Sequence, residues 1–437
     1  MLEELHLRHV GPAPEFRLEL GERLNLLTGD NGLGKSFLLD VAWWALTGTW
    51  AGSSAWPRRD GPQATPEICC RFADGRDPGA ESLRSSFDFQ RQAWTRRWPV
   101  RRIQAVVIYA RVDGGFSVWD PARSHLGDEG GLSVPTAVPT SIAPSRAPTA
   151  YHFTSSTLWN GLEQDGKVVC NGLIRDWVSW QNQPDQDERS PFRALSRVIA
   201  RLSPHPTEWM RPGKPTRVSI ADVRDIPTIE LPYGSVPVIY ASAGVQRILA
   251  LAYLLVWTWY EHVQASRLAN TAPAQSLVLL MDEVEAHLHP RWQRTIMPAL
   301  LGAAGDLQKS IRTQVIATTH SPLLLASVEP LFDESRDCLF SFQLEGGRVS
   351  LDQVPWAKQG DAVGWLTSDI FGLRQARSQE AEVAIEAAEA FMRGDDMRAY
   401  PEHLRTQQQI HKELLRVLAG HDPFWPRWIV AVESEHP

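Results

Sequence analysis

The stretch from Gly29 to Ser36 constrains the fold of this chain more than any other part of the sequence. Its eight residues, GDNGLGKS, fit the pattern G-x-x-x-x-G-K-[ST]. Apolar runs at 24–28 and 37–46 flank it, which predicts a strand, a glycine-rich turn and a helix in succession. In that context glycines let backbone N–H groups point at phosphate oxygens, and the start of the helix adds partial positive charge. The stretch therefore predicts a nucleotide-binding site.

Two side chains of this stretch have predicted roles of their own. Lys35 is expected to reach the β- and γ-phosphates of the nucleotide, and the Ser36 hydroxyl to ligate magnesium. A chance glycine turn before a helix is the alternative, and it does not account for the full pattern. The predicted nucleotide contacts are Asp30, Asn31, Gly32, Leu33, Gly34, Lys35, Ser36 and Phe37.

Length, charge and cysteine content limit the class of protein. A chain of 437 residues can form two or three domain-sized units, or one large α/β core with insertions. Its net charge of −7 argues against a globally basic nucleic-acid-binding protein, although a local basic patch could still bind. The four cysteines show no metal-ligand spacing and no disulfide framework, which predicts reduced thiols. With neither a signal peptide nor an apolar run of 18 residues, we expect a cytoplasmic protein with no membrane partner.

The pattern of apolar residues predicts most of the remaining elements. Strands are expected at 104–110, 277–281 and 314–318, a hairpin at 111–119, and broken strands over 217–240. Helices are expected within 158–202, at 244–260, and from Leu351 to Leu418, followed by an aromatic tail at 424–428. The Pro-, Ser-, Ala- and Thr-rich segment 121–150 is expected to be a loop.

The apolar run at 277–281 ends in two acidic residues, Asp282 and Glu283. A parallel strand beside the phosphate loop would bring Asp282 into the magnesium shell. Glu283 would then lie near the γ-phosphate, where its carboxylate could polarise the attacking water. Such a run commonly marks a strand that meets solvent, but downstream of a phosphate loop it predicts a metal ligand and a catalytic base.

His320 follows the predicted strand 314–318 in the segment Thr-Thr-His-Ser-Pro. Nucleotides bind at the carboxyl ends of strands in open α/β sheets, so this histidine is predicted to contact the γ-phosphate or the attacking water. The alternative is a turn residue before Ser-Pro.

A fourth segment opens the predicted helix 244–260 and contains Ser242, Ala243, Gly244 and Gln246. A serine followed by a glycine at a helix start offers a hydroxyl and free N–H groups to a phosphate. These four residues are predicted nucleotide contacts, and the alternative is an ordinary serine N-cap.

Taken in order, these motifs resemble the ABC-type ATPases of the SMC, RecF and OLD kind. Together with the Glu-Ala-His-Leu-His-Pro segment at 285–290, they are similar in particular to stand-alone ATPases of bacterial anti-phage systems, of the Septu and retron-associated types. The resemblance covers residues 1–350. It implies an α/β fold, namely a P-loop ABC-type ATPase head with an antiparallel β subdomain, a helical lobe carrying the signature motif, and a helical C-terminal extension. ATP and Mg²⁺ are the implied cofactors.

The resemblance also implies a head-to-tail homodimer or higher homo-oligomer, with two ATP molecules between the subunits. Ser242 and Gly244 would contact the γ-phosphate held by the other subunit, and the loop from Glu285 to His289 would cross the interface. His287 and His289, although spaced like metal ligands, are expected to pack in that interface. The sequence departs from the family pattern at Ala243, and no glutamine loop is identifiable; Trp159–Gly161 is the candidate for that magnesium contact.

The predicted domain boundaries follow from these motifs. They are 1–120 for the N-terminal part of ATPase lobe I, 121–150 for a flexible loop, 151–262 for the helical lobe with the signature, 263–354 for the C-terminal part of lobe I, and 355–437 for the helical extension.

Our leading hypothesis is an ATP-hydrolysing sensor or scaffold subunit of a bacterial anti-phage defence system. The interval between Ser36 and Ser242 holds prolines, tryptophans and short elements where SMC-like proteins have coiled coils, and the C-terminal part lacks a Toprim nuclease motif. A separate effector, such as an HNH-type nuclease, would then supply the second activity. The segment 356–420 and the aromatic tail at 424–428 are candidate docking surfaces.

Two alternatives remain open. A RecF- or SMC-like DNA repair or recombination ATPase would bind nucleic acid, and Gln90–Arg102, which interleaves arginines with tryptophans, would contact it. The same segment can equally be a solvated face with tryptophans packed beneath. The nucleotide-binding subunit of a membrane transporter is the other alternative, against which the missing glutamine loop argues.

Overall fold

The computed structural model describes residues 1–59, 61, 64–72, 83–95, 104–124, 150–183, 190–204, 207–308 and 310–434. The chain divides into two compact units, 1–360 and 361–437. Of the predicted loop 121–150, residues 121–124 form a short helix and residues 125–149 lie outside the described residues. Residues 96–102 of the arginine- and tryptophan-rich segment lie outside them too.

A large mixed sheet organises the first unit. Its strand order is β20-β19-β3-β18-β17-β7-β8-β9, in which β19, β3, β18, β17 and β7 run parallel and the outer pairs are antiparallel. The strands are β3 (Leu24–Gly29), β7 (Ala105–Ala110), β8 (Phe116–Trp119), β9 (Tyr151–Phe153), β17 (Ser276–Met281), β18 (Arg312–Thr318), β19 (Asp337–Glu345) and β20 (Arg348–Val354). β7 and β17 are buried along their whole length, as expected for parallel strands covered on both faces.

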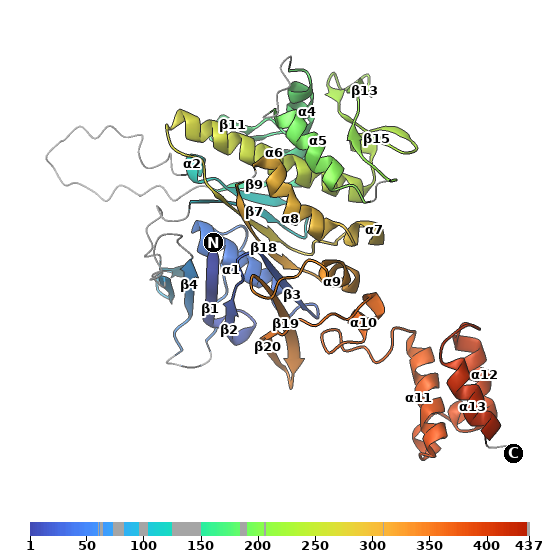
Figure 1. Cartoon of the computed structure of the whole chain (residues 1–437). Coiled ribbons are helices and arrows are strands. Elements are labelled where there is room, and N and C mark those ends of the chain that lie inside the picture. The colour runs from blue at the N-terminus through green and yellow to red at the C-terminus, as the bar shows by residue number, and fades with distance from the viewer. Residues whose placement is uncertain are drawn as a thin grey trace. The chain divides into compact units, whose positions relative to one another are not determined.

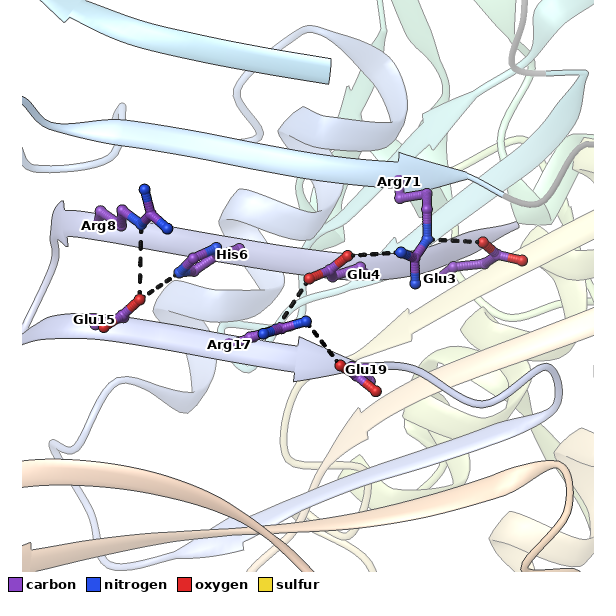
Figure 2. A network of polar contacts seen from close by, with 8 residues as sticks. All are labelled: Glu3, Glu4, His6, Arg8, Glu15, Arg17, Glu19 and Arg71. Carbon is purple, nitrogen blue, oxygen red and sulfur yellow. Dashed lines mark hydrogen bonds and ion pairs between the residues drawn. The ribbon is translucent and has the colours of Figure 1, made fainter. Parts of the chain in front are cut away.

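A second, antiparallel sheet has the order β2-β1-β4-β5-β6. Its strands are β1 (Leu2–Val10), β2 (Ala13–Glu19), β4 (Glu67–Phe72), β5 (Leu83–Asp88) and β6 (Ala93–Trp94). On one face Leu5, Leu7 and Phe16 are buried in the core, while the alternating residues face outward. Figure 2 shows that four glutamates, three arginines and His6 on that outer face pair with one another, for example Arg17 with Glu4 at 3.0 Å. The charged side chains of this network are therefore paired with one another.

Helix α1 (Lys35–Thr47) lies between the two sheets and contacts β1 on one side and β7, β17 and β18 on the other (Figure 1). It is apolar all round, with Trp43 and Leu39 fully buried, which explains why its sequence shows little amphipathic pattern. The central core of the unit gathers around this helix. The phosphate loop that precedes it is thus anchored between two buried layers.

Two further helices contact the large sheet: α6 packs against β7, and α8 packs against β18. The remaining helices of the first unit are α2 (Pro121–Ser124), α3 (Ser155–Asn160), α4 (Leu173–Gln181), α5 (Pro191–Arg201), α6 (Ala243–Leu268), α7 (Pro290–Gln293), α8 (Ile296–Leu307) and α9 (Pro322–Val328). Short strands accompany them: β10 (Leu162–Gln164), β11 (Lys167–Cys170), β12 (Arg211–Pro212), β13 (Thr216–Arg217), β14 (Asp225–Ile226), β15 (Thr228–Leu231) and β16 (Gly234–Pro237).

The second unit is helical. It contains α10 (Ala362–Leu366), α11 (Gln379–Arg393), α12 (Gln407–Val417) and α13 (Trp425–Ser434). The helices α11, α12 and α13 share one apolar cluster, in which Trp428 is fully buried and Phe424 and Trp425 nearly so. The predicted aromatic tail is therefore wrong as a free docking surface, because its rings form the core of this unit.

The mixed α/β fold is confirmed, and so are the strands at 277–281 and 314–318 and the helix at 244–260. Two helical expectations are wrong. Residues 351–354 belong to β20, which pairs with β19 in an antiparallel hairpin. The turn between the two strands contains Gly346 and Gly347, whose φ angles are +55° and +78°. Residues 162–170 form the hairpin β10–β11 around Asp165-Gly166. In both places a Gly-Gly or Asp-Gly turn signal was present in the sequence.

Candidate active site

The predicted site residues gather at the carboxyl edge of the large sheet. β3 leads into the phosphate loop, β17 ends before Asp282, and β18 ends at Thr318 just before His320. Because these strands are parallel neighbours, their carboxyl ends meet at one edge. The order of strands thus brings together segments that are up to 290 positions apart.

The phosphate loop surrounds the ammonium group of Lys35 with backbone carbonyls. Lys35 is buried, and its Nζ donates to the backbone carbonyls of Gly29 at 2.8 Å and Asp30 at 2.6 Å. Burial lowers the pKa of Lys35, and the nearby carboxylates, first among them Glu283, act in the opposite direction. Gly34 starts helix α1 with φ of +108°, and a Cβ there would lie 2.6 Å from Pro12, so the position requires glycine. The ammonium group therefore lies inside the loop where phosphate oxygens would bind.

A cluster of oxygen atoms lies beside the loop. The Ser36 hydroxyl donates to Oδ1 of Asp282 at 3.0 Å, and the Thr318 hydroxyl donates to the same oxygen at 2.7 Å. Asp282 is buried at the end of β17. Hydroxyl and carboxylate oxygens at this spacing fit the hard-oxygen preference of Mg²⁺, so Ser36 and Asp282 could hold the ion.

Glu283 follows Asp282 in an unusual backbone conformation, with φ of +46°. Its backbone N–H donates to the Thr318 hydroxyl at 2.7 Å. The Nε2 atom of His320 lies 3.9 Å from a carboxylate oxygen of Glu283. Burial, and secondly the charge of Lys35, lower the pKa of His320, which favours a neutral imidazole at neutral pH. Glu283 and His320 therefore face each other beside the phosphate loop.

Glu285 connects two of these segments. Its carboxylate accepts the backbone N–H of His320, and burial raises its pKa. This contact ties the loop that follows β17 to the segment that follows β18. His287, two residues further on, is exposed and has φ of +65°, whereas His289 caps helix α7 by accepting the N–H of Arg291.

The signature segment forms the start of α6. Ser242 is exposed and its hydroxyl accepts the N–H of Val245 at 3.4 Å, so the serine is an N-cap. Gln246 donates to the carbonyl of Ile239 at 3.0 Å. A Cβ on Gly244 would lie 3.0 Å from the carbonyl oxygen of His287. The contacts of this segment are thus with 238–239 and the 285–289 loop of its own chain, while Ser242 and Ala243 face outward.

Three side chains at this edge were not singled out from the sequence. Thr318 bridges Asp282 and Glu283, Arg247 contacts the backbone after β17, and Asp40 accepts a hydrogen bond from Tyr109 at 3.1 Å. Thr318 could have been found, since it is the last residue of a strand that ends at the site. Arg247 and Asp40 lie on helices, and only the packing of those helices brings them here.

The candidate for the glutamine loop, Trp159–Gly161, does not follow the strand that neighbours β17. Trp159–Gly161 follows β9, and two strands, β7 and β8, separate β9 from β17. The strand beside β17 is β7, and the N–H of Asp282 donates to the carbonyl of Ala110 at its end. The chain that lies next to Asp282 is therefore the β7–β8 turn, which contains Arg111 and Asp113.

Metal-ligand clusters, cysteines and membrane-spanning helices were also considered by their residues. Among the residues that the structure describes, no group of three or more His, Cys, Asp or Glu side chains could hold a metal ion. All four cysteines are free thiols, and Cys70 and Cys170 are buried. In the described helices, none combines the length and apolar character needed to cross a membrane.

Parts of this chain are similar in sequence to known proteins. Residues 158–326 match the family described as "AAA domain, putative AbiEii toxin, Type IV TA system". The chain is 36% identical to the Septu protein PtuA of Bacillus mycoides over 132 residues. This stretch makes up 30% of this chain and 16% of that protein. The retron Vc95 probable ATPase of Vibrio cholerae is 41% identical over 51 residues, or 12% of this chain and 9% of that protein. The chain spans less than a quarter of the length of the curated relatives it matches.

Solved structures show a more distant likeness. The Smc head bound to the C-terminal winged-helix domain of ScpA has a TM-score of 0.41 at 13% identity, covering 81% of this chain and 98% of that one. RecF with ATPrS has a TM-score of 0.37 at 14% identity, with the same coverage. The resemblance to defence-system ATPases is confirmed, since residues 158–326 match an AbiEii-type ATPase family and parts of the chain are similar to Septu and retron ATPases.

Proposed function

We propose that this chain binds ATP and magnesium at the carboxyl edge of its large sheet and hydrolyses the γ-phosphate. The observation that supports the proposal is the convergence of the glycine-rich loop around Lys35 with the Ser36–Asp282 pair, 3.0 Å apart. The family match and the relatives named as probable ATPases support the same activity.

Each residue has a physical role in this proposal. Lys35 and the backbone N–H groups of the loop bind the phosphates, and Ser36 and Asp282 hold the metal. Mg²⁺ would neutralise charge on the β- and γ-phosphates. Glu283 accepts a proton from, or orients, the attacking water, and neutral His320 contacts the same water or the γ-phosphate.

Two further parts of the proposal concern assembly. Two copies would close head to tail around ATP, so that the exposed Ser242 of one copy reaches the γ-phosphate held by the other. Since the relatives are Septu and retron proteins, we propose that the chain is the cytoplasmic sensor or scaffold of an anti-phage system and controls a separate effector, such as a nuclease. A RecF-like ATPase that binds DNA is the alternative. The arginines drawn on the outer face of β1, β2 and β4 are paired with glutamates, so they do not form a free basic patch there (Figure 2).

The first experiment is the mass in solution of Glu283→Gln, by light scattering, with and without ATP and Mg²⁺. The amide cannot accept a proton, so hydrolysis should slow by about 10²-fold or more while ATP binding persists. We expect the mass to rise from 49.0 kDa to about twice that value when ATP is added.

Glu345→Gln is the matched control, because Glu345 is exposed on the β19–β20 hairpin and should leave hydrolysis unchanged. Hydrolysis at the parent rate in Glu283→Gln would show that Glu283 is not the base. A constant mass with ATP bound would exclude ATP-driven dimer formation, and a parent that binds no ATP would refute the proposal as a whole.

A further inference from the structure

Arg247 lies on helix α6, five residues after Ser242, and its side chain points at the end of β17. One guanidinium nitrogen, Nη2, lies 3.4 Å from the backbone carbonyl of Asp282 and 3.4 Å from that of Glu283. This nitrogen carries two N–H groups, so it can donate one to each of the two neighbouring carbonyls.

The environment of this guanidinium is half-buried and acidic. Carboxylates of Asp282, Glu283, Glu285 and Asp113 surround it, and they favour its charged form. Burial acts in the opposite direction and, as the larger effect, lowers the pKa of Arg247 from its usual value. Arginine nevertheless keeps its charge at physiological pH. A cation at this point offsets repulsion among acids that arrive from β17 and from the β7–β8 turn.

The backbone of Glu283 needs support from both sides. Its φ of +46° is uncommon for a residue with a side chain, and such conformations persist when surrounding contacts hold them. The Thr318 hydroxyl accepts its N–H at 2.7 Å, and Arg247 approaches its carbonyl. The two contacts fix the plane of the peptide groups on either side of the Cα, and so the direction of the carboxylate.

We propose that Arg247 is a positioning residue for Glu283. It holds the carbonyls of Asp282 and Glu283 so that the Glu283 carboxylate stays directed at the water that attacks ATP. This inference rests on the proposed function, because it concerns the efficiency of the same hydrolysis. Arg247 itself need not touch the nucleotide.

The test compares Arg247→Met and Arg247→Lys with the parent in ATP binding and in hydrolysis. Methionine keeps the apolar stem but removes the donors, so we expect kcat to fall about 10- to 100-fold, as small misplacements of catalytic groups do. The affinity for a non-hydrolysable ATP analogue should stay within about 3-fold, since binding depends on the phosphate loop. Lysine keeps the charge and the N–H donors but ends in a compact ammonium group on a different stem, so it should recover part of the loss.

Arg267→Met is the matched control, because Arg267 is exposed in the last turn of the same helix. It should leave both quantities unchanged. An equal loss of kcat in this variant would point to a general effect on α6 and would overturn the proposal.

A double substitution separates positioning from general damage. If Arg247 acts through Glu283, then adding Arg247→Met to Glu283→Gln should reduce single-turnover hydrolysis by less than about 3-fold further. A full 10- to 100-fold additional loss would overturn the proposal. Should Arg247→Met fail to fold, the same cycle with Arg247→Lys decides the question.

These measurements also separate a failure of the proposed ATPase function from a failure of the proposed role of Arg247. A parent protein without ATPase activity would refute the proposed function. An active parent whose hydrolysis is indifferent to Arg247→Met and Arg247→Lys would refute this inference alone.

Discussion

At the scale of single residues, Asp40 shows how strongly packing changes an ordinary carboxyl. It lies on α1, one turn after Ser36, and accepts a hydrogen bond from the hydroxyl of Tyr109. Burial raises its pKa from 3.8 to about 6, although the Tyr109 contact acts in the opposite direction. The folded state therefore disfavours the ionised form, while the unfolded chain does not.

The sign of the resulting pH dependence follows directly. Below pH 3.8 Asp40 is protonated in both states and costs nothing; as the pH rises through 6, ionisation costs folding free energy. We expect Asp40→Asn to stabilise the nucleotide-free protein at pH 8 by roughly 1 to 3 kcal/mol relative to the parent, and by much less as the pH falls toward 4. Urea unfolding at several pH values measures this. A difference that does not change with pH would contradict the assignment to the carboxyl.

At the scale of elements, the helices α11, α12 and α13 depend on one tryptophan. Trp428 is fully buried, and its indole N–H donates to His411 at 3.0 Å. Replacement of a buried tryptophan by alanine removes a large apolar surface and leaves a cavity, which costs about 3 to 5 kcal/mol. The free energy of unfolding of a unit of this size is small, so a loss of this magnitude is enough to unfold it.

We therefore expect Trp428→Ala to abolish slow hydrogen exchange in α11 to α13 while amides of β17 and β18 stay protected. Hydrogen exchange read by mass spectrometry resolves the two units. Ile429→Ala is the control, since Ile429 is 45% exposed and should change protection little. Equal loss of protection in both units would mean that they unfold as one.

At the scale of the whole molecule, the proposed dimer depends on a surface that the isolated chain leaves open. Ser242 and Ala243 are exposed at the start of α6, whereas Gly244 packs against the carbonyl of His287. In the Glu283→Gln background, Ser242→Arg should prevent the ATP-driven rise in mass, because a long cation would occupy the space of the partner's γ-phosphate site. Nucleotide affinity of the monomer should persist, which fluorescent ATP analogues measure.

Ser156→Arg, on an exposed position of α3, is the comparison for added bulk and charge. It should leave the mass change intact. Retention of the dimer in Ser242→Arg would remove the signature segment from the proposed interface.

The sequence by itself determined the parts of the site whose contacts are local. Lys35 binds carbonyls five and six residues away, so the glycine pattern was enough to predict the loop. Strand ends at Asp282 and before His320 were also predictable, because apolar runs fix where a buried strand stops. The two wrong helical expectations, at 162–170 and from Leu351, lie beside Asp-Gly and Gly-Gly turn signals.

Only the tertiary structure decided which segments meet. Ser36 and Asp282 are 246 positions apart, and their contact depends on β18 lying between β3 and β17. Gln314, which looks like an ordinary strand residue, binds the backbone of Leu2 across 312 positions. Arg247 reaches Glu283 because α6 packs beside β7. Such contacts depend on how apolar faces are buried together, and local sequence does not specify that partner choice.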